Sequence, residues 1–331
     1  MPSNFPMARA RRLRRTAALR DLVRENSLVP ADLIWPIFIC EGRGISEGVS
    51  SMPGVARMSV DRAIEALRHA FDLGITTAAL FPYVEREKKS SNCEEAWNPD
   101  NLVNRATRQI KSALPDMAVL VDVALDPYNA DGHDGLLRNG EILNDETVEC
   151  LVKEAISHAE AGADILGPSD MMDGRIGAIR KSLENHKFQN TAIMSYSAKY
   201  ASAFYGPFRN AVGSGELLRG DKKSYQMDPG NSIEALRMVQ RDIAEGADIV
   251  MVKPGMPYLD ICRLVASSVS VPTFAYQVSG EYSMLQASSL NGWIELDAAV
   301  AESLLSFKRA GCRGILTYFA VYAAEKILKN N

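Results

Sequence analysis

Two lysines stand at the ends of apolar segments that have the composition of buried strands. Residues 247–252 read Ala-Asp-Ile-Val-Met-Val before Lys253, and residues 191–198 form a second strand-like run before Lys199. Uniformly apolar strands are typical of parallel sheets covered by helices, which carry their chemistry at the carboxyl ends of the strands. The two lysines are therefore expected at one rim of such a sheet, as a pair of amines.

Paired amines suit chemistry on a carbonyl group. A lysine forms an imine only when it is neutral, whereas its reference pKa is about 10.4. Two ammonium groups roughly 6 Å apart repel by ~3 kcal/mol at an effective dielectric near 20, which equals about two pKa units. Apolar walls would lower the pKa further. The pair predicts a nucleophilic amine near neutral pH, whereas a lone lysine at a strand end is usually a solvated surface group.

Carboxylates follow the third predicted strand, residues 118–125. Asp122 lies in this strand, Asp126 comes directly after it, and Asp134 lies in the loop beyond. They could orient a substrate amine, bind a metal or cap a turn, and the sequence leaves these interpretations open. Hydroxyl groups at other predicted strand ends belong to Ser169, Ser279 and Tyr318.

A long connection runs from Tyr205 to Asp228 after the fifth predicted strand. It contains four glycines, Gly215 among them, and the cations Arg209, Arg219, Lys222 and Lys223. A loop of this length inside a domain is usually either a lid or disordered. Cations on a lid suit an anionic substrate, and a carboxylate is favoured over a phosphate because the loops after strands seven and eight lack glycine-rich nests. A basic surface loop would look similar.

The pattern of the whole chain predicts one α/β domain. Strands are expected at residues 33–39, 76–81, 118–125, 163–169, 191–199, 247–254, 272–279 and 314–319, with amphipathic helical patterns between them. Eight strands that alternate with helices predict a (β/α)8 TIM barrel. A doubly wound open sheet is the alternative, but no G-x-G-x-x-G follows the first strand, so no dinucleotide site is indicated.

Composition excludes several classes of protein. The net charge is −4, which gives no electrostatic reason to expect nucleic acid. The five cysteines are widely spaced without a C-x-x-C pair, which indicates reduced thiols and a cytoplasmic location rather than zinc or disulfides. No apolar stretch approaches the roughly 20 residues that a membrane helix needs. A small molecule is the expected partner.

The first 30 residues are expected to form an arm, and residues 31–331 the catalytic barrel. The arm contains the run Arg-Arg-Leu-Arg-Arg at residues 11–15, followed by Leu19, Leu22 and Val23 as an apolar stripe. A transit peptide is the alternative for such an acid-poor start. An amphipathic arm is suited to clasping a neighbouring subunit.

Three stretches together resemble porphobilinogen synthase, also called 5-aminolevulinate dehydratase. They are residues 251–255 (Met-Val-Lys-Pro-Gly), residues 197–209 from Ser-Ala-Lys to Pro-Phe-Arg, and residues 222–227 (Lys-Lys-Ser-Tyr-Gln-Met). The resemblance covers nearly the whole chain. It implies a lyase of tetrapyrrole synthesis that condenses two 5-aminolevulinate molecules to porphobilinogen with loss of two waters. It also implies an arm-clasped homo-oligomer, an octamer or a hexamer.

The resemblance also implies roles for single residues. Lys253 would form the imine with the first-bound substrate, whose carboxylate would meet Ser279 and Tyr318, and Lys199 would serve the second substrate. Asp122 is expected to act with the two lysines as a catalytic residue. The remaining residues expected to bind substrate are Arg209, Lys222 and Gln226 from the lid, together with Asp126, Asp134, Ser169 and Tyr205.

One departure from the family concerns metal. Zinc-dependent relatives carry three cysteines after the third strand, where this sequence has Ala124, Asp126 and Asp134, and many magnesium-stimulated relatives carry a glutamate where it has Met238. Zinc needs thiolate or imidazole ligands for tight binding. Magnesium accepts oxygen ligands, but one or two carboxylates hold the hydrated ion weakly. We therefore expect no required cofactor and no metal site.

Two other functions fit the same residues. A class I aldolase would use a single imine-forming lysine on a barrel, and a non-catalytic binding barrel would use none. Trapping of an imine distinguishes the three cases, because the number of labelled lysines differs.

Overall fold

Eight parallel strands form the centre of the computed structural model, which describes residues 4–213, 217–218 and 220–328. They are β1 (Leu33–Cys40), β4 (Thr77–Pro82), β5 (Ala118–Val123), β8 (Ile165–Pro168), β9 (Ala192–Lys199), β10 (Ile249–Lys253), β11 (Thr273–Gln277) and β12 (Gly314–Thr317). Each strand pairs with the next, and β12 pairs with β1, so the sheet closes into a barrel. The predicted (β/α)8 fold is confirmed, and all eight predicted strands end within two residues of the observed ones.

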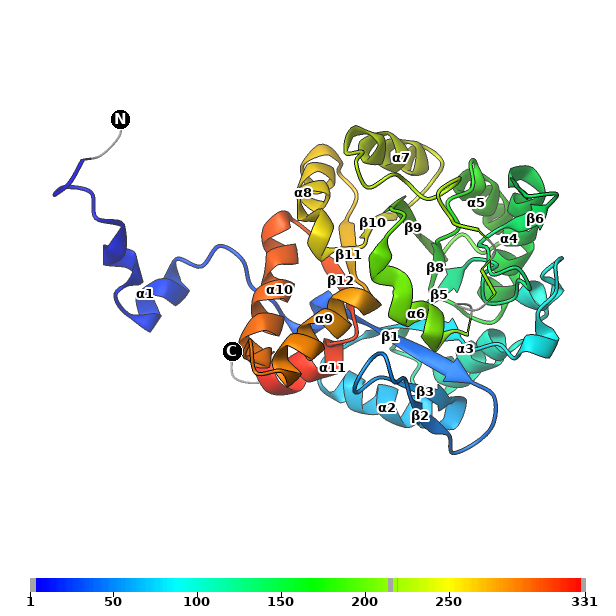
Figure 1. Ribbon diagram of the computed structural model, residues 1–331, viewed down its shortest axis with the longest axis horizontal. Coiled ribbons are helices and arrows are strands. Elements are labelled where there is room, and N and C mark those ends of the chain that lie inside the picture. The colour runs from blue at the N-terminus through cyan, green and yellow to red at the C-terminus, as the bar shows by residue number, and fades with distance from the viewer. Residues whose placement is uncertain (1–3, 214–216, 219, 329–331) are drawn as a thin grey trace.

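Helices surround the barrel in Figure 1. The longer ones are α2 (Val60–Asp72), α3 (Leu102–Ala113), α4 (Asn144–Glu160), α5 (Arg175–Asn185), α7 (Ile233–Ala244), α8 (Leu259–Ser268), α9 (Ser279–Leu290) and α10 (Leu296–Ala310). Apolar residues at helical spacing face the barrel; in α2, for example, Ala63, Leu67 and Ala70 are buried. Two short helices, α6 (Gly206–Ala211) and α11 (Ala320–Ala323), follow β9 and β12.

Glycines separate the helices from the strands that follow them. Gly246 and Gly311 come after α7 and α10 and have φ angles of 109° and 103°. This left-handed conformation ends a helix and is unfavourable for residues with a side chain. The chain therefore turns at fixed points and enters the next strand in the register that brings the functional residues to the same rim.

Two small hairpins were not predicted from the sequence. β2 (Ser46–Gly48) and β3 (Ala56–Ser59) are antiparallel to one another, and β3 extends the sheet beside β1. β6 (Leu136–Arg138) and β7 (Glu141–Leu143) form a separate ribbon in the loop after β5. These strands are only three or four residues long, so they have neither the apolar run nor the alternation that identifies a strand.

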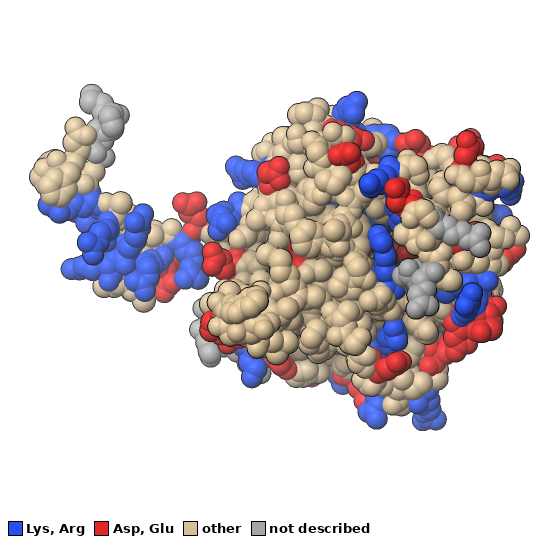
Figure 2. All heavy atoms as spheres, in the orientation of Figure 1, with Lys and Arg blue, Asp and Glu red and all other residues tan. Residues whose placement is uncertain are grey.

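The N-terminal segment extends away from the barrel (Figure 1). It contains a 3-10 turn at Ala10–Arg14 and the six-residue helix α1 (Ala17–Leu22), whose Thr16 side chain caps its first turn. A helix this short is marginal in water without a packing partner. Arginine side chains gather along this arm in Figure 2, and its large apolar side chains are exposed: Phe5, Met7, Leu13, Leu22 and Val23.

None of the helices in the described part of the chain is long and apolar enough to cross a bilayer.

Candidate active site

The two lysines predicted to form a pair are direct neighbours. Lys199 ends β9, Lys253 ends β10, and their Cα atoms are partners in the parallel ladder. Both side chains are more than nine-tenths buried. The sheet therefore brings two amines together at the carboxyl rim of the barrel, where enzymes of this fold keep their active sites.

A β-bulge in β9 shapes the surroundings of the pair. Val250 of β10 lies opposite Ser195 and Val252 lies opposite Ala198, so three steps along β9 match two along β10. In a regular strand, Tyr196 and Lys199 would point to opposite faces, because side chains alternate. The extra residue changes that alternation. As a result, the Tyr196 ring lies 5.0 Å from the Lys253 Nζ, and the Lys199 side chain lines one cavity together with Lys253.

Aromatic rings enclose the Lys253 amine. Its Nζ lies between 4.9 and 5.4 Å from the ring centroids of four residues, which are Tyr196, Tyr205, Phe208 and Tyr276. Burial and, second, the positive charge of Lys199 lower the pKa of Lys253 to about 7, although the nearby carboxylates act in the opposite direction. Both effects were predicted, but burial is the larger one. The amine is therefore substantially neutral near pH 7 and available as a nucleophile.

Asp122 lies at the end of β5, close to both amines. Burial raises its pKa to about 7, whereas the charges of Lys253 and Lys199 and a hydrogen bond from Ser169 oppose that rise. Its Oδ1 is buried and makes no hydrogen bond to any residue that the structure describes. A carboxyl group and an amine with pKa values near 7 can exchange a proton at neutral pH, so Asp122 is suited to proton transfer at Lys253.

Lys199 is held by a carbonyl and a carboxylate. Its Nζ donates to the backbone oxygen of Ser169 and lies 3.5 Å from Asp134 Oδ1. Lys222 lies on the other side of the carboxylates, 3.1 Å from Asp134 and 3.7 Å from Asp126. Burial alone would raise the pKa of Asp134, but these ammonium groups outweigh it and hold the pKa below its usual value. At Asp126 burial prevails and the pKa is raised.

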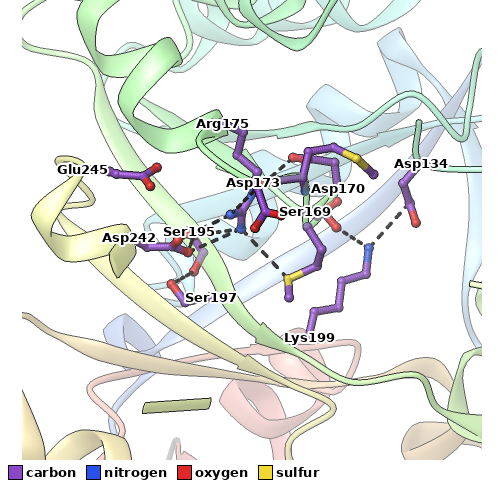
Figure 3. A network of polar contacts seen from close by, with 12 residues as sticks. Asp134, Ser169, Asp170, Asp173, Arg175, Ser195, Ser197, Lys199, Asp242 and Glu245 are labelled. Carbon is purple, nitrogen blue, oxygen red and sulfur yellow. Dashed lines mark hydrogen bonds and ion pairs between the residues drawn. The ribbon is translucent and has the colours of Figure 1, made fainter. Parts of the chain in front are cut away.

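A second buried network lies beside Lys199 (Figure 3). The Arg175 guanidinium, at the start of α5, is fully buried and lies 3.4 Å from both Asp170 and Asp242. It also donates to Ser195 of β9, which in turn donates to Asp242 over 2.6 Å. The network joins β9 and α7 to the residue that follows Ser169. It thereby fixes the carbonyl that holds Lys199.

One cavity contains most of the residues predicted for the site. It is lined by ten of them, together with Phe208: Asp122, Asp126, Asp134, Ser169, Lys199, Tyr205, Arg209, Lys222, Gln226 and Lys253. Its volume is about 30 Å³, whereas small-molecule sites usually measure about 300–1,000 Å³. The segment that covers it must therefore move before a substrate can enter.

Ser279 and Tyr318 do not line this cavity. The Ser279 Oγ accepts from the Phe208 backbone N–H at 2.9 Å, and the Tyr318 hydroxyl lies 2.9 Å from that of Tyr276. Both residues are buried, and the Phe208 ring packs against Phe38 and Phe81. Ser279 and Tyr318 therefore lie next to the site but do not line its cavity.

The covering segment begins with α6 after β9. Arg57 of β3 donates to the carbonyls of Asn210 and Ala211, both at 2.7 Å, so the unpredicted hairpin supports the end of this helix. Arg209 and Lys222 from this segment line the cavity, as predicted for lid cations. The predicted lid residues Gly215 and Arg219 lie outside the described residues.

The donor groups after β5 do not fit a zinc ion. Ala124 offers no ligand atom, and the carboxylates of Asp126 and Asp134 face the Lys222 ammonium. Within residues 4–213, 217–218 and 220–328, no group of three or more His, Cys, Asp and Glu side chains is arranged to hold a metal. Met238 lines a separate hollow of about 680 Å³, and its thioether is a poor ligand for a hard cation.

Sequence reasoning named Tyr205 but missed the other three aromatic residues around Lys253. Tyr196 and Tyr276 looked like packing residues of apolar strands, and Phe208 lay in the recognised stretch of residues 197–209 without an assigned role. A tyrosine on each of the two strands that flank β10 was the available signal for the first two. Neither the bulge nor the fold of the lid could be inferred from it.

Known proteins match this chain over nearly its full length. The family model for delta-aminolevulinic acid dehydratase matches residues 7–326. The delta-aminolevulinic acid dehydratase of Rhodobacter capsulatus is 58% identical over 323 residues, which cover 98% of this chain and 97% of the relative. That of Bradyrhizobium diazoefficiens is 56% identical over 319 residues, covering 96% and 90%.

A solved structure gives the same result. The delta-aminolevulinic acid dehydratase (porphobilinogen synthase) of Toxoplasma gondii, in complex with the reaction product porphobilinogen, is 47% identical in sequence and superposes with a TM-score of 0.96. The match covers 100% of this chain and 93% of that one. With its paired lysines, barrel and near-complete match, the chain belongs to the delta-aminolevulinic acid dehydratase family.

Proposed function

We propose that this chain is a lyase that condenses two molecules of 5-aminolevulinate to porphobilinogen with loss of two waters, in tetrapyrrole biosynthesis. The observation that carries the proposal is the pair of buried lysines at adjacent strand ends, one of which has a pKa of about 7. Membership of the family supplies the substrate, and the site supplies amines for its ketone and cations for its carboxylate.

Lys253 is the nucleophile for the first substrate in this proposal. Its neutral amine attacks the ketone carbon, the carbinolamine loses water, and a protonated imine remains on Nζ. Asp122 accepts and returns protons during these steps, since the pKa values of the two groups lie close together. Ser279 and Tyr318 receive the substrate carboxylate once the Phe208 backbone leaves the Ser279 hydroxyl.

Lys199 serves the second substrate. Arg209, Lys222 and Gln226 line the cavity on the lid side and bind the carboxylate of this molecule. Without substrate, Asp126 and Asp134 pair with the Lys222 ammonium group. When the second substrate binds, its own amino group takes the place of Lys222 beside these carboxylates. Ser169 holds Lys199 through its carbonyl, and the Tyr205 hydroxyl donates to the Lys253 carbonyl at 3.2 Å.

The reaction proceeds without a bound divalent ion in this proposal. The loop after β5 combines an alanine with two carboxylates that already face ammonium groups. Lys199 and Lys222 supply positive charge at the site.

The active form is a homo-oligomer, an octamer or a hexamer, in which the arm packs on a neighbouring barrel. The support is the exposure of the arm's apolar side chains, of which Phe5, Met7 and Leu22 are each at least three-quarters exposed. We place the enzyme in the cytoplasm, because all five cysteines are free and buried. The net charge of −4 favours a small-molecule substrate over nucleic acid.

Imine trapping tests the proposal. The protein is incubated with 5-aminolevulinate and cyanoborohydride, and the modified lysines are mapped by peptide mass, with porphobilinogen formation measured in parallel. Label at Lys253 and product formation are expected, and Lys253→Arg should abolish turnover because a guanidinium stays charged. An aldolase would be labelled at one lysine and form no porphobilinogen. Absence of label would indicate a binding barrel.

A further inference from the structure

Glu281 joins two strand ends from inside the protein. It is the third residue of α9 and is fully buried. Its carboxylate accepts three backbone N–H groups: Val278 at 2.7 Å, Met256 at 2.5 Å and Gly255 at 3.3 Å. Val278 follows β11, whereas Gly255 and Met256 follow β10. One side chain therefore fixes the ends of both strands relative to each other.

The residues beside these three N–H groups are those proposed for the first substrate. Gly255 lies two positions after Lys253, and Val278 immediately precedes Ser279. The turn after Lys253 is also restrained from its other side, because a Cβ on Gly255 would lie 2.5 Å from the Phe307 ring and 3.0 Å from the Tyr276 carbonyl. The Lys253 backbone is thus held between tight packing and the Glu281 carboxylate.

Helix capping accounts for only part of this arrangement. A glutamate at the third helical position often accepts the N–H of the residue before the helix, as Glu281 does with Val278. The other two bonds reach the start of the 3-10 turn at Met256–Tyr258, which follows β10, and contribute nothing to capping α9. No cation pairs with Glu281 among the described residues, and burial raises its pKa to about 7 against the effect of the three N–H donors. Burying a carboxyl group without a cation costs free energy that its hydrogen bonds must offset, and here those bonds go to three backbone N–H groups at two strand ends.

We propose that Glu281 is a positioning residue for the condensation, one that sets the separation of Lys253 and Ser279 so that the first substrate's ketone lies at attacking distance from the amine. The inference rests on the proposed function and adds a residue outside the substrate cavity to it. An amide at this position has one acceptor oxygen and cannot accept all three N–H groups. The two strand ends would then be free to move apart.

The test uses the full-length protein and 4-oxopentanoate, which has the ketone and carboxylate of the substrate but no amine. Cyanoborohydride trapping gives the rate of label at Lys253 and the ratio of label at Lys253 to that at Lys199. Glu281→Gln should reduce the Lys253 rate by about 100-fold, the size of effect that a misplacement of about 1 Å can produce. The ratio should fall with it, because the bonds that hold Lys199 are untouched.

Asp248→Asn is the matched control. Asp248 also bonds to a neighbouring strand, since its carboxylate accepts the Ile193 N–H at 2.8 Å, but at the opposite end of β10. This variant should lose stability while keeping the wild-type labelling ratio. Glu281→Asp keeps the charge but is shorter by one methylene, so an intermediate loss is expected; it decides the question if Glu281→Gln does not fold.

Two results would overturn the inference. One is a folded Glu281 variant with the wild-type rate and ratio, and the other is a loss of rate that follows thermal stability, as in Asp248→Asn, with an unchanged ratio. Failure of the proposed function has a different signature, because the wild-type protein itself would then form no porphobilinogen from 5-aminolevulinate.

Discussion

Replacing Lys199 with methionine should raise the pKa of Lys253. The two residues are partners on adjacent strands, so their ammonium groups can lie roughly 6 Å apart and repel by ~3 kcal/mol at an effective dielectric near 20, or about two pKa units. Removal of this charge shifts the value from about 7 to about 9. Loss of the ion pair between Lys199 and Asp134 acts in the same direction.

The change can be read from imine formation at pH 7. The neutral fraction of Lys253 falls from about one half to about 1% when its pKa rises by two units, so trapping with 4-oxopentanoate should slow by about 50-fold. A series of labelling rates from pH 5.5 to 10 then gives the midpoint directly. The assay needs only Lys253, so it does not depend on turnover.

Lys199→Arg is the control, because it keeps a positive charge beside Lys253 and cannot form an imine. Its midpoint should stay near that of the wild type. A Lys199→Met midpoint that also stays near 7 would refute the argument, since burial by the aromatic rings alone would then account for the low pKa.

Further predictions concern stability, metal and assembly. The pKa of Lys253 is held at about 7, below its unfolded value of 10.5, so the unfolded chain binds more protons between pH 7 and 10.5 and the stability of the fold rises with pH there. Lys253→Met should therefore be more stable than the wild type by roughly 4–5 kcal/mol at pH 6–7, a gain that fades towards pH 10.5 in urea titrations. Arg175→Gln should destabilise the fold by about 3 kcal/mol, because two buried carboxylates lose their cation; an unchanged urea midpoint would contradict this. Activity should survive prolonged EDTA treatment, with no stoichiometric divalent ion in elemental analysis, and activity that returns only on adding magnesium or zinc would disprove the metal-free proposal. Deletion of residues 1–28 should shrink the particle in sedimentation while the circular dichroism of the barrel persists, and an unchanged particle would show that the arm has another role.

The barrel could be predicted because its signals are local. Each strand is an apolar run, and glycines such as Gly246 and Gly311 mark where a helix must stop. Adjacent parallel strands bring their carboxyl ends to one edge, so two runs that end on Lys199 and Lys253 were enough to predict the pair.

The environment of the pair depends on contacts between distant segments. The rings around Lys253 come from β9, from β11 and from the segment at residues 205–208, and only the folded chain brings them together. For the same reason, the sequence indicated charge repulsion but could not show that burial is the larger effect. The bond between Ser279 and Phe208 depends on the lid conformation, which no spacing in the sequence reports.

The bulge in β9 has a consequence for anyone who wishes to transplant this chemistry into another barrel. Grafting two lysines onto neighbouring strands of a regular host would reproduce their spacing but would turn the Tyr196 equivalent outward. The grafted amine would then lose one wall of its apolar enclosure, and a larger share of it would stay protonated at neutral pH. A successful graft therefore has to include the additional backbone residue as well as the side chains. Deleting that residue from this protein should correspondingly leave the Lys253 amine protonated at neutral pH and unreactive.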